Sequence, residues 1–202
     1  MQFLGTQIKL ARPKKPRRII RDYLTEKEIR EIIRNCSGLR EKALILILAY
    51  SGLRAREVCA LRVSDMNLAE RSILVRDGKG SQDRIVHVSG SCVKVLRKYL
   101  SFNHKAKDGF LFMNKTNIQP LSPYALRKTI KRISKRTTLE KRIYPHLFRH
   151  SLATNLLING CNLLAIQEQL GHRNIQTTLI YLHSTPMIRR AMYDRFCPKY
   201  AE

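Results

Sequence analysis

The sequence predicts a mainly α-helical domain with one small antiparallel β-sheet, an α+β fold. The first helix begins at a capping box, with Thr25 as the N-cap and Glu28 as the third helical residue. Three isoleucines then follow at helical spacing and give this helix one apolar face. A second helix, from about residue 40 to residue 50, is apolar almost all round and is therefore expected at the centre of the domain.

The hydrophobic period changes between residues 72 and 88. The stretches 72–76 and 84–88 are rich in β-branched side chains, and Asp77-Gly78-Lys79-Gly80-Ser81 lies between them. Two such strands around a glycine-containing turn predict a β-hairpin. The segment 110–113 is predicted to form a short third strand.

Caps and helix breakers place the remaining helices. Ser122-Pro123 supplies an N-cap followed by proline at the first helical position, and Gly160 and Gly171 are expected to end two later helices. The helices are expected at about residues 54–61, 92–100, 123–136, 145–159, 162–170, 176–182 and 187–196.

The charge balance points to a polyanionic partner. The 202 residues contain 39 Lys and Arg against 15 Asp and Glu, a formal net charge of +24, while 44% hydrophobic residues suffice for a folded core. Double-stranded DNA is the expected partner. A membrane surface is the second candidate partner. No apolar segment, however, approaches the roughly 20 residues of a spanning helix. The N-terminus also lacks a signal-peptide pattern, and the chain is therefore expected to be cytoplasmic and nucleoid-associated.

The cysteines give no sign of a metal or disulfide framework. There are five of them, an odd number, and no two are spaced as a CxxC pair. Acidic residues are too scarce for a carboxylate cluster that would hold two catalytic metal ions. We therefore expect neither a zinc site nor a pair of catalytic metal ions.

A set of cations, histidines and a tyrosine suits attack on a phosphodiester without a metal. His146 and Arg149 are spaced i, i+3 and share a helix face. His172 follows a helix break, and Tyr181 lies nine positions on. Two arginines from separate segments could stabilise the charge that develops on a phosphorane, and neighbouring cations or a base could activate a tyrosine. Tyr193 is the rival nucleophile.

These residues resemble the tyrosine recombinases, or phage integrases, especially the Xer-like and integrase-like members. The resemblance is carried, over about residues 23–185, by the segments Ser51–Val58, Asp77–Ser81, Pro145–Ser151 and Leu170–Tyr181. It implies a catalytic-domain fold, no cofactor or metal, and six catalytic residues: Arg54, Lys79, His146, Arg149, His172 and Tyr181. Tyr181 would attack to leave a 3′-phosphotyrosyl DNA, and Lys79 would protonate the leaving 5′-oxygen. Arg54, Arg149 and His172 would bind the phosphate, His146 would act as acid or base, and Glu57 would brace the site.

The resemblance also implies an assembly and a division of the chain. Four protomers would bring two duplexes together and exchange strands through a Holliday junction. Residues 1–22 would form a basic arm or linker, 23–185 the catalytic domain, and 186–202 a tail helix that packs into a neighbouring protomer. The alternative is a tail helix that packs on its own domain. Most members of the family carry an N-terminal DNA-clamping domain, so the chain is either a fragment or a single-domain recombinase. DNA backbone contacts are expected from Arg127, Lys128, Lys131, Arg132, Lys135 and Arg136.

Three other functions are compatible with parts of this pattern. A type IB topoisomerase-like enzyme would use the same chemistry to relax DNA without bringing two duplexes together. A DNA-binding accessory protein would have lost strand transfer, although the six candidate residues are intact. A basic RNA- or ribosome-binding protein would explain the charge but not the ordered motifs.

Overall fold

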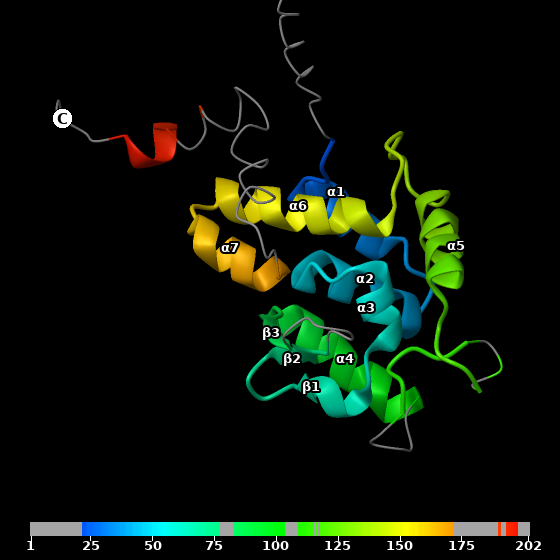
Figure 1. The fold of residues 1–202 in the computed structure, drawn as a ribbon. Coiled ribbons are helices and arrows are strands. Elements are labelled where there is room, and N and C mark those ends of the chain that lie inside the picture. The colour runs from blue at the N-terminus through cyan, green and yellow to red at the C-terminus, as the bar shows by residue number, and fades with distance from the viewer. Residues whose placement is uncertain are drawn as a thin grey trace, which may run out of the picture.

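The computed structural model describes residues 22–76, 83–103, 109–114, 116, 118–171, 190 and 193–197. Over these residues the protein is mostly helical, with one three-stranded antiparallel sheet, as the sequence predicted (Figure 1). The helices are α1 (Glu26–Arg34), α2 (Leu39–Ser51), α3 (Ala55–Ala60), the 3₁₀ helix η1 (Val63–Asp65), α4 (Gly90–Asn103), α5 (Pro123–Ser134), α6 (Pro145–Ile158) and α7 (Leu163–Leu170). The strands are β1 (Met66–Asn67), β2 (Ser72–Val75) and β3 (Arg84–His87).

Helix α2 is the central element. Every residue from Ala43 to Ala49 is buried, because the helix packs against α4 on one side and α6 on the other. Each fully buried leucine or isoleucine contributes roughly 1.5–3 kcal/mol, so this helix supplies much of the stabilising apolar burial. Figure 1 shows α6 and α7 on one side of α2 and the sheet with α4 on the other.

The helix ends follow the local signals in the sequence. The Thr25 hydroxyl accepts from the amide of Glu28, whose carboxylate accepts from the Thr25 amide at 2.7 Å, which confirms the capping box. Ser122 caps α5 and Asn162 caps α7 through their side-chain oxygens. Gly171 ends α7 in the left-handed conformation, with φ of 66°. In each case the cap satisfies backbone groups that a helix end leaves without partners.

The sheet has the order β1-β2-β3, and its second hairpin pairs Ser72 with His87 and Val75 with Arg84. The prediction of a third strand at residues 110–113 was wrong. Phe110 forms an isolated bridge to Arg62, and Met113 forms another to Pro120. Because the two ends of the segment bond to different parts of the chain, no continuous ladder forms there. The third strand is instead β1, only two residues long and held by pairing with β2.

A second, smaller apolar cluster joins α6 to α7. It contains Leu152, Ala153, Leu157, Ile166 and Leu170, all buried. Its position fixes the end of α7 against α2 and α6. Over the described residues, no helix has the length and apolar character needed to cross a membrane.

Candidate active site

Arg54 stands at the turn between α2 and α3. Gly52 ends α2 with φ of 66°, and Arg54 is the N-cap of α3. The backbone amide of Arg54 donates to Glu57 Oε2 at 2.7 Å, and its Nη1 donates to Glu57 Oε1 at 2.8 Å. The Glu57 side chain is 8% exposed and the Arg54 side chain 48% exposed. Glu57 therefore anchors Arg54 from the protein side, and the guanidinium remains open to a ligand.

Arg149 is a buried cation held by two backbone carbonyls. The residue is 1% exposed on α6. Its Nη1 donates to the Gly52 carbonyl and its Nη2 to the Leu170 carbonyl, each at 2.7 Å. These oxygens lie at the C-terminal ends of α2 and α7, where the helix dipole places partial negative charge. Two helix ends thus stabilise a charge whose burial would otherwise cost several kcal/mol.

The close approach of these helix ends depends on Gly52. A Cβ atom there would lie 2.6 Å from Leu170 Cδ2 and 3.0 Å from Leu152 Cδ2. The left-handed backbone at Gly52 is also unfavourable for other residues. Glycine at this position therefore allows the Gly52 carbonyl to reach Arg149.

His146 lies one helical turn before Arg149 on α6 and is exposed. The i, i+3 spacing places the two side chains on neighbouring positions of the helix surface. Since Arg149 bonds to Gly52, two residues before Arg54, the fold brings the predicted residues Arg54, Glu57, His146 and Arg149 into one region. Two segments distant in sequence, the start of α3 and the first half of α6, thus converge where the phosphodiester chemistry was predicted.

Sequence reasoning missed Arg84, at the start of β3. Its Nη2 pairs with Glu57 Oε2 at 2.9 Å, and its side chain is only 13% exposed. A Cβ on Gly171 would lie 2.6 Å from Arg84 Nε, so the side chain packs against the end of α7. Burial alone would raise the pKa of Glu57, but hydrogen bonds and charge from Arg84 and Arg54 hold it below the usual value. A strand arginine gives no local sequence signal of such a role.

Gln169, also missed, joins α7 to the sheet. Its Nε2 donates to the His87 carbonyl at 2.9 Å, and its Oε1 accepts from the His87 amide at 3.0 Å. The same Nε2 lies 3.3 Å from the Ser51 carbonyl at the end of α2. The side-chain amide of Gln169 therefore satisfies both backbone groups of His87, as a neighbouring strand would. It also links the edge of β3 to the helix ends around Arg149.

The phage integrase family profile matches residues 22–187 of the chain. The chain belongs to the phage integrase family. It is 37% identical over 171 residues to a tyrosine recombinase of Thermosipho africanus, covering 83% of this chain and 59% of that protein. It is 36% identical to tyrosine recombinase XerA of Pyrococcus horikoshii, covering 88% and 61%. The integrase-family chain thus spans about three-fifths of the length of these relatives.

Solved structures of the family share the fold. A crystal structure of XerA recombinase superposes with a TM-score of 0.82 at 35% identity, over 90% of this chain and 67% of that one. XerH site-specific recombinase, bound to its palindromic difH substrate in a post-cleavage complex, gives 0.72 at 25% identity, over 88% and 53%. The predicted tyrosine recombinase catalytic-domain fold is confirmed.

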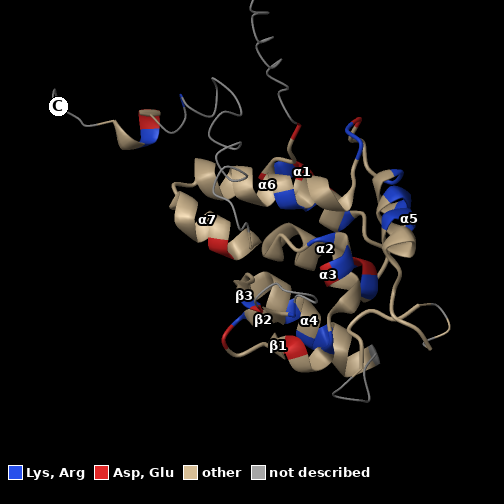
Figure 2. Cartoon of the chain, in the orientation of Figure 1, with Lys and Arg blue, Asp and Glu red and all other residues tan. Residues whose placement is uncertain are grey.

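The basic residues of α5 and its C-terminal end divide into two groups. Figure 2 shows Lys and Arg gathered along α5. Arg127, Lys128, Lys131 and Lys135 are exposed, as expected for residues that contact DNA. Arg132 and Arg136, which the sequence also suggested for DNA contacts, are exposed as well but form ion pairs with Glu41, the Arg132 pair at 2.7 Å. Through Glu41 these two arginines link the C-terminal end of α5 to α2.

Glu41 is the buried carboxylate of that cluster, with its side chain 9% exposed. Burial alone would raise its pKa. Hydrogen bonds from Ser37, Arg132 and Arg136 outweigh this effect and lower the pKa to about 2. Glu41 is therefore ionised over the whole physiological range and contributes to the attachment of α5.

Three predicted catalytic residues lie outside the described residues: Lys79, His172 and Tyr181. In sequence, Lys79 falls between β2 and β3, and His172 directly follows Gly171. Of the predicted tail helix, Arg190 and residues 193–196 are helical. The Phe196 ring lies against Gly160, where a Cβ would be 2.6 Å from the ring.

Proposed function

We propose that this chain is the catalytic domain of a site-specific DNA recombinase, which cleaves and rejoins DNA through a 3′-phosphotyrosyl intermediate at Tyr181. The observation that carries the proposal is the hydrogen bond from buried Arg149 to Gly52, which brings a second arginine beside the turn of Arg54. The relatives named tyrosine recombinases, and XerH bound to its DNA substrate, support the same reaction.

In the proposed reaction Arg54 and Arg149 bind the non-bridging oxygens of the scissile phosphate. Their charges stabilise the phosphorane, which carries more negative charge than the ground state. The carbonyl groups of two helix ends fix the orientation of the Arg149 guanidinium. Because Arg149 is 1% exposed, DNA binding must uncover it before phosphate can reach it. Glu57 holds Arg54 by its backbone and side chain, which fixes the direction of the second guanidinium.

The remaining residues carry out the proton transfers. The Tyr181 oxygen forms a bond to phosphorus and loses its proton, for which His146 is the proposed base. The bond from phosphorus to the 5′-oxygen breaks, and Lys79 protonates that oxygen. His172 donates a hydrogen bond to the phosphate. The phosphotyrosine linkage conserves the energy of the broken bond, so rejoining by a 5′-hydroxyl requires neither ATP nor a metal.

The partner is double-stranded DNA, and the proposed place of action is the nucleoid in the cytoplasm. Residues 1–22 form a basic arm or linker and 23–185 the catalytic domain. The proposed contacts to the DNA phosphates come from exposed side chains on α5 and at its C-terminal end: Arg127, Lys128, Lys131 and Lys135. Such contacts release counterions, and binding is therefore expected to weaken steeply as salt rises.

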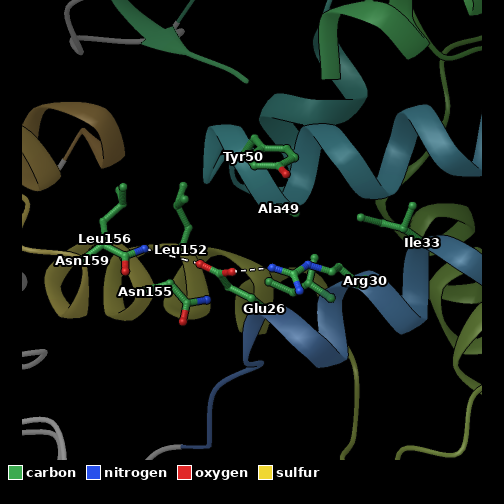
Figure 3. A pocket seen from close by; sticks show the side chains of 10 residues that line it. Glu26, Arg30, Ile33, Ala49, Tyr50, Leu152, Asn155, Leu156 and Asn159 are labelled. Carbon is green, nitrogen blue, oxygen red and sulfur yellow. Dashed lines mark hydrogen bonds and ion pairs between the residues drawn. The ribbon is translucent and has the colours of Figure 1, made fainter. Parts of the chain in front are cut away.

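The proposed active assembly is a homotetramer in which residues 186–202 of one protomer pack on the next. A cavity of about 250 Å³ lies between α1, the end of α2, and α6. Its apolar wall includes Ile29, Leu152 and Leu156, and Figure 3 shows Glu26 between Arg30 and Asn159 at its side. In sequence the tail carries Ile188, Met192 and Phe196 at i, i+4, i+8, an apolar stripe suited to such a wall. The exchange requires the contact of Phe196 with Gly160 of its own chain to open. Leu156→Asp and deletion of 186–202 should each reduce the tetramer fraction on DNA in sedimentation experiments, whereas Leu164→Asp, at an exposed position on α7, should not.

Covalent trapping tests the reaction itself. The protein is incubated with nicked duplexes of randomised sequence, and protein–DNA adducts are recovered under denaturing conditions and sequenced. An adduct with the wild type that is absent with Tyr181→Phe establishes the nucleophile and reveals the preferred site. An adduct that persists in the variant points to Tyr193 instead. DNA binding without any adduct contradicts strand transfer and favours an accessory DNA-binding protein.

A further inference from the structure

Arg84 and Arg54 share a single carboxylate. Glu57 Oε1 accepts from Arg54 Nη1 at 2.8 Å, while Oε2 accepts from Arg84 Nη2 at 2.9 Å. Oε2 also accepts from the backbone amide of Arg54 at 2.7 Å. Two arginines and one carboxylate leave this cluster with a net charge of +1.

The charge of Arg84 lies on the protein side of the cluster. Its side chain is 13% exposed, against 48% for Arg54. It also packs against Gly171, so its position is fixed from β3 and from the end of α7 together. Arg84 therefore neutralises Glu57 from within, whereas Arg54 faces outward.

We infer that Arg84 is a positioning residue, which keeps Arg54 available to the scissile phosphate by occupying Glu57 Oε2. Without Arg84 the cluster would consist of one arginine and one carboxylate, with no net charge. Arginine and carboxylate groups also favour a two-bond, fork-to-fork pairing. Arg54 would then be drawn onto Glu57 with both of its terminal nitrogens, and its attraction for phosphate would fall. This inference rests on the proposed function, because it concerns the phosphate that Arg54 binds.

The chain contains a matched control at the other strand of the same hairpin. Arg76 follows β2 as Arg84 begins β3, and its Nε pairs with Asp65 Oδ1 at 2.8 Å. Asp65 also accepts from the backbone amide of the residue three positions earlier, Arg62, at 2.8 Å, as Glu57 does from Arg54. The guanidinium of Arg62, however, stacks on Phe110. Arg76→Met removes a strand-to-carboxylate ion pair of similar length away from the proposed phosphate site, with the Arg76 side chain 58% exposed against 13% for Arg84.

The test compares wild type, Arg84→Met, Arg84→Lys and Arg76→Met on two substrates. One carries the ordinary phosphodiester at the trapped site, and the other a methylphosphonate, whose linkage is neutral and requires less cationic stabilisation. Arg84→Met should slow adduct formation on the phosphodiester by about 10- to 100-fold, less than the roughly 10²–10³-fold cost of deleting an oxyanion donor outright. On the methylphosphonate the loss should shrink to about threefold or less, because little anionic charge remains to stabilise. Arg84→Lys, which retains the charge, should lie between, and Arg76→Met should match wild type on both.

Equal losses on the two substrates would show that Arg84 only supports the fold and would overturn the inference. A second measurement does not depend on cleavage: inorganic phosphate is titrated while the guanidinium NMR signal of Arg54 is followed. Arg84→Met should weaken phosphate binding at Arg54 by about tenfold, corresponding to one charge contact, and Arg76→Met should leave it unchanged. If wild type forms no adduct, the proposed function fails; if phosphate affinity is the same with and without Arg84, the positioning role fails.

Discussion

The guanidinium of Arg149 and the carbonyl of Gly52 are joined by a 2.7 Å hydrogen bond across 97 residues of sequence. This bond places a buried arginine from α6 beside the turn that carries the exposed Arg54. The two arginines are therefore supported in different ways, one by backbone carbonyls and one by a carboxylate. Substitutions at the two positions should separate stability from activity.

Arg149→Lys should lower both stability and strand cleavage, because an ammonium group cannot span both carbonyls as the guanidinium fork does. An unsatisfied buried carbonyl costs about 1–3 kcal/mol. Arg54→Lys should slow cleavage by about 10²-fold while changing the free energy of unfolding by less than about 0.5 kcal/mol. Urea unfolding and adduct formation measure the two effects. Equal stability losses at the two positions would contradict the difference in support.

Gly52→Ala should destabilise the protein by about 1–3 kcal/mol, because its Cβ would meet Leu170 at 2.6 Å in a left-handed backbone. The matched control is Gly90→Ala at the start of α4, where no atom lies within 4 Å of the new Cβ. That change should be neutral or stabilising by up to about 1 kcal/mol. Thermal unfolding of the two variants should therefore shift in different directions, and a neutral Gly52→Ala would show that the helix ends can separate freely.

Glu41 should make stability depend on acidic pH. Its folded pKa of about 2 lies below the ordinary value of 4.5, so its ionised form stabilises the fold above pH 4.5. This contribution is lost as pH falls from about 4.5 towards 2. We expect about 2 kcal/mol at neutral pH, after allowing for screening around the partly exposed arginines. Urea unfolding of wild type and Glu41→Gln should differ at pH 7 and converge near pH 2, whereas Glu26→Gln should change little at either pH.

Lys131 and Arg132 should have different effects on DNA binding, although they are neighbours on α5. Lys131 is exposed, and Lys131→Ala should reduce the slope of log affinity against log salt by about 1 if it contacts one phosphate. Arg132→Ala removes an ion pair with Glu41 and should chiefly lower stability. Fluorescence anisotropy over a salt series, with urea unfolding alongside, distinguishes them. An equal change of slope would show that Arg132 leaves Glu41 for DNA.

Gln169→Met should loosen the edge of β3, because methionine retains the volume but neither hydrogen bond to His87. The His87 amide should then exchange with solvent about fivefold faster, which corresponds to loss of a hydrogen bond worth roughly 1 kcal/mol. Glu168→Gln, at the preceding exposed position, serves as the control. Unchanged protection of the His87 amide would show that another group satisfies the strand edge.

The elements with local signals were predicted correctly from the sequence. The Thr25 capping box, the cap at Ser122 and the glycine ending α7 each rest on residues within one turn of each other. The strand β1 carried no such signal, because two residues acquire strand geometry only by pairing with β2. Segment 110–113 had strand-like residues but no continuous partner, and the prediction of a strand there was wrong.

In the site, too, the residues within local motifs were predicted, and the residues whose contacts are distant in sequence were not. Arg54, His146 and Arg149 were predicted from motifs, and the fold brings their segments together. Arg84 and Gln169 escaped prediction because their contacts, with Glu57 and His87, span 27 and 82 residues and leave no trace in local spacing. The ion pairs of Arg132 and Arg136 with Glu41 were missed for a similar reason, since they join positions 91 and 95 residues apart.

The supports of Arg149 have a consequence for redesign. The two carbonyl groups that hold it belong to the main chain, so no side-chain exchange elsewhere in the protein deletes them. The exposed surface of α5 and the support of Arg149 can therefore be changed separately. Substitutions on the exposed face of α5 leave both carbonyl partners of Arg149 in place, provided that Glu41 keeps its two arginine partners.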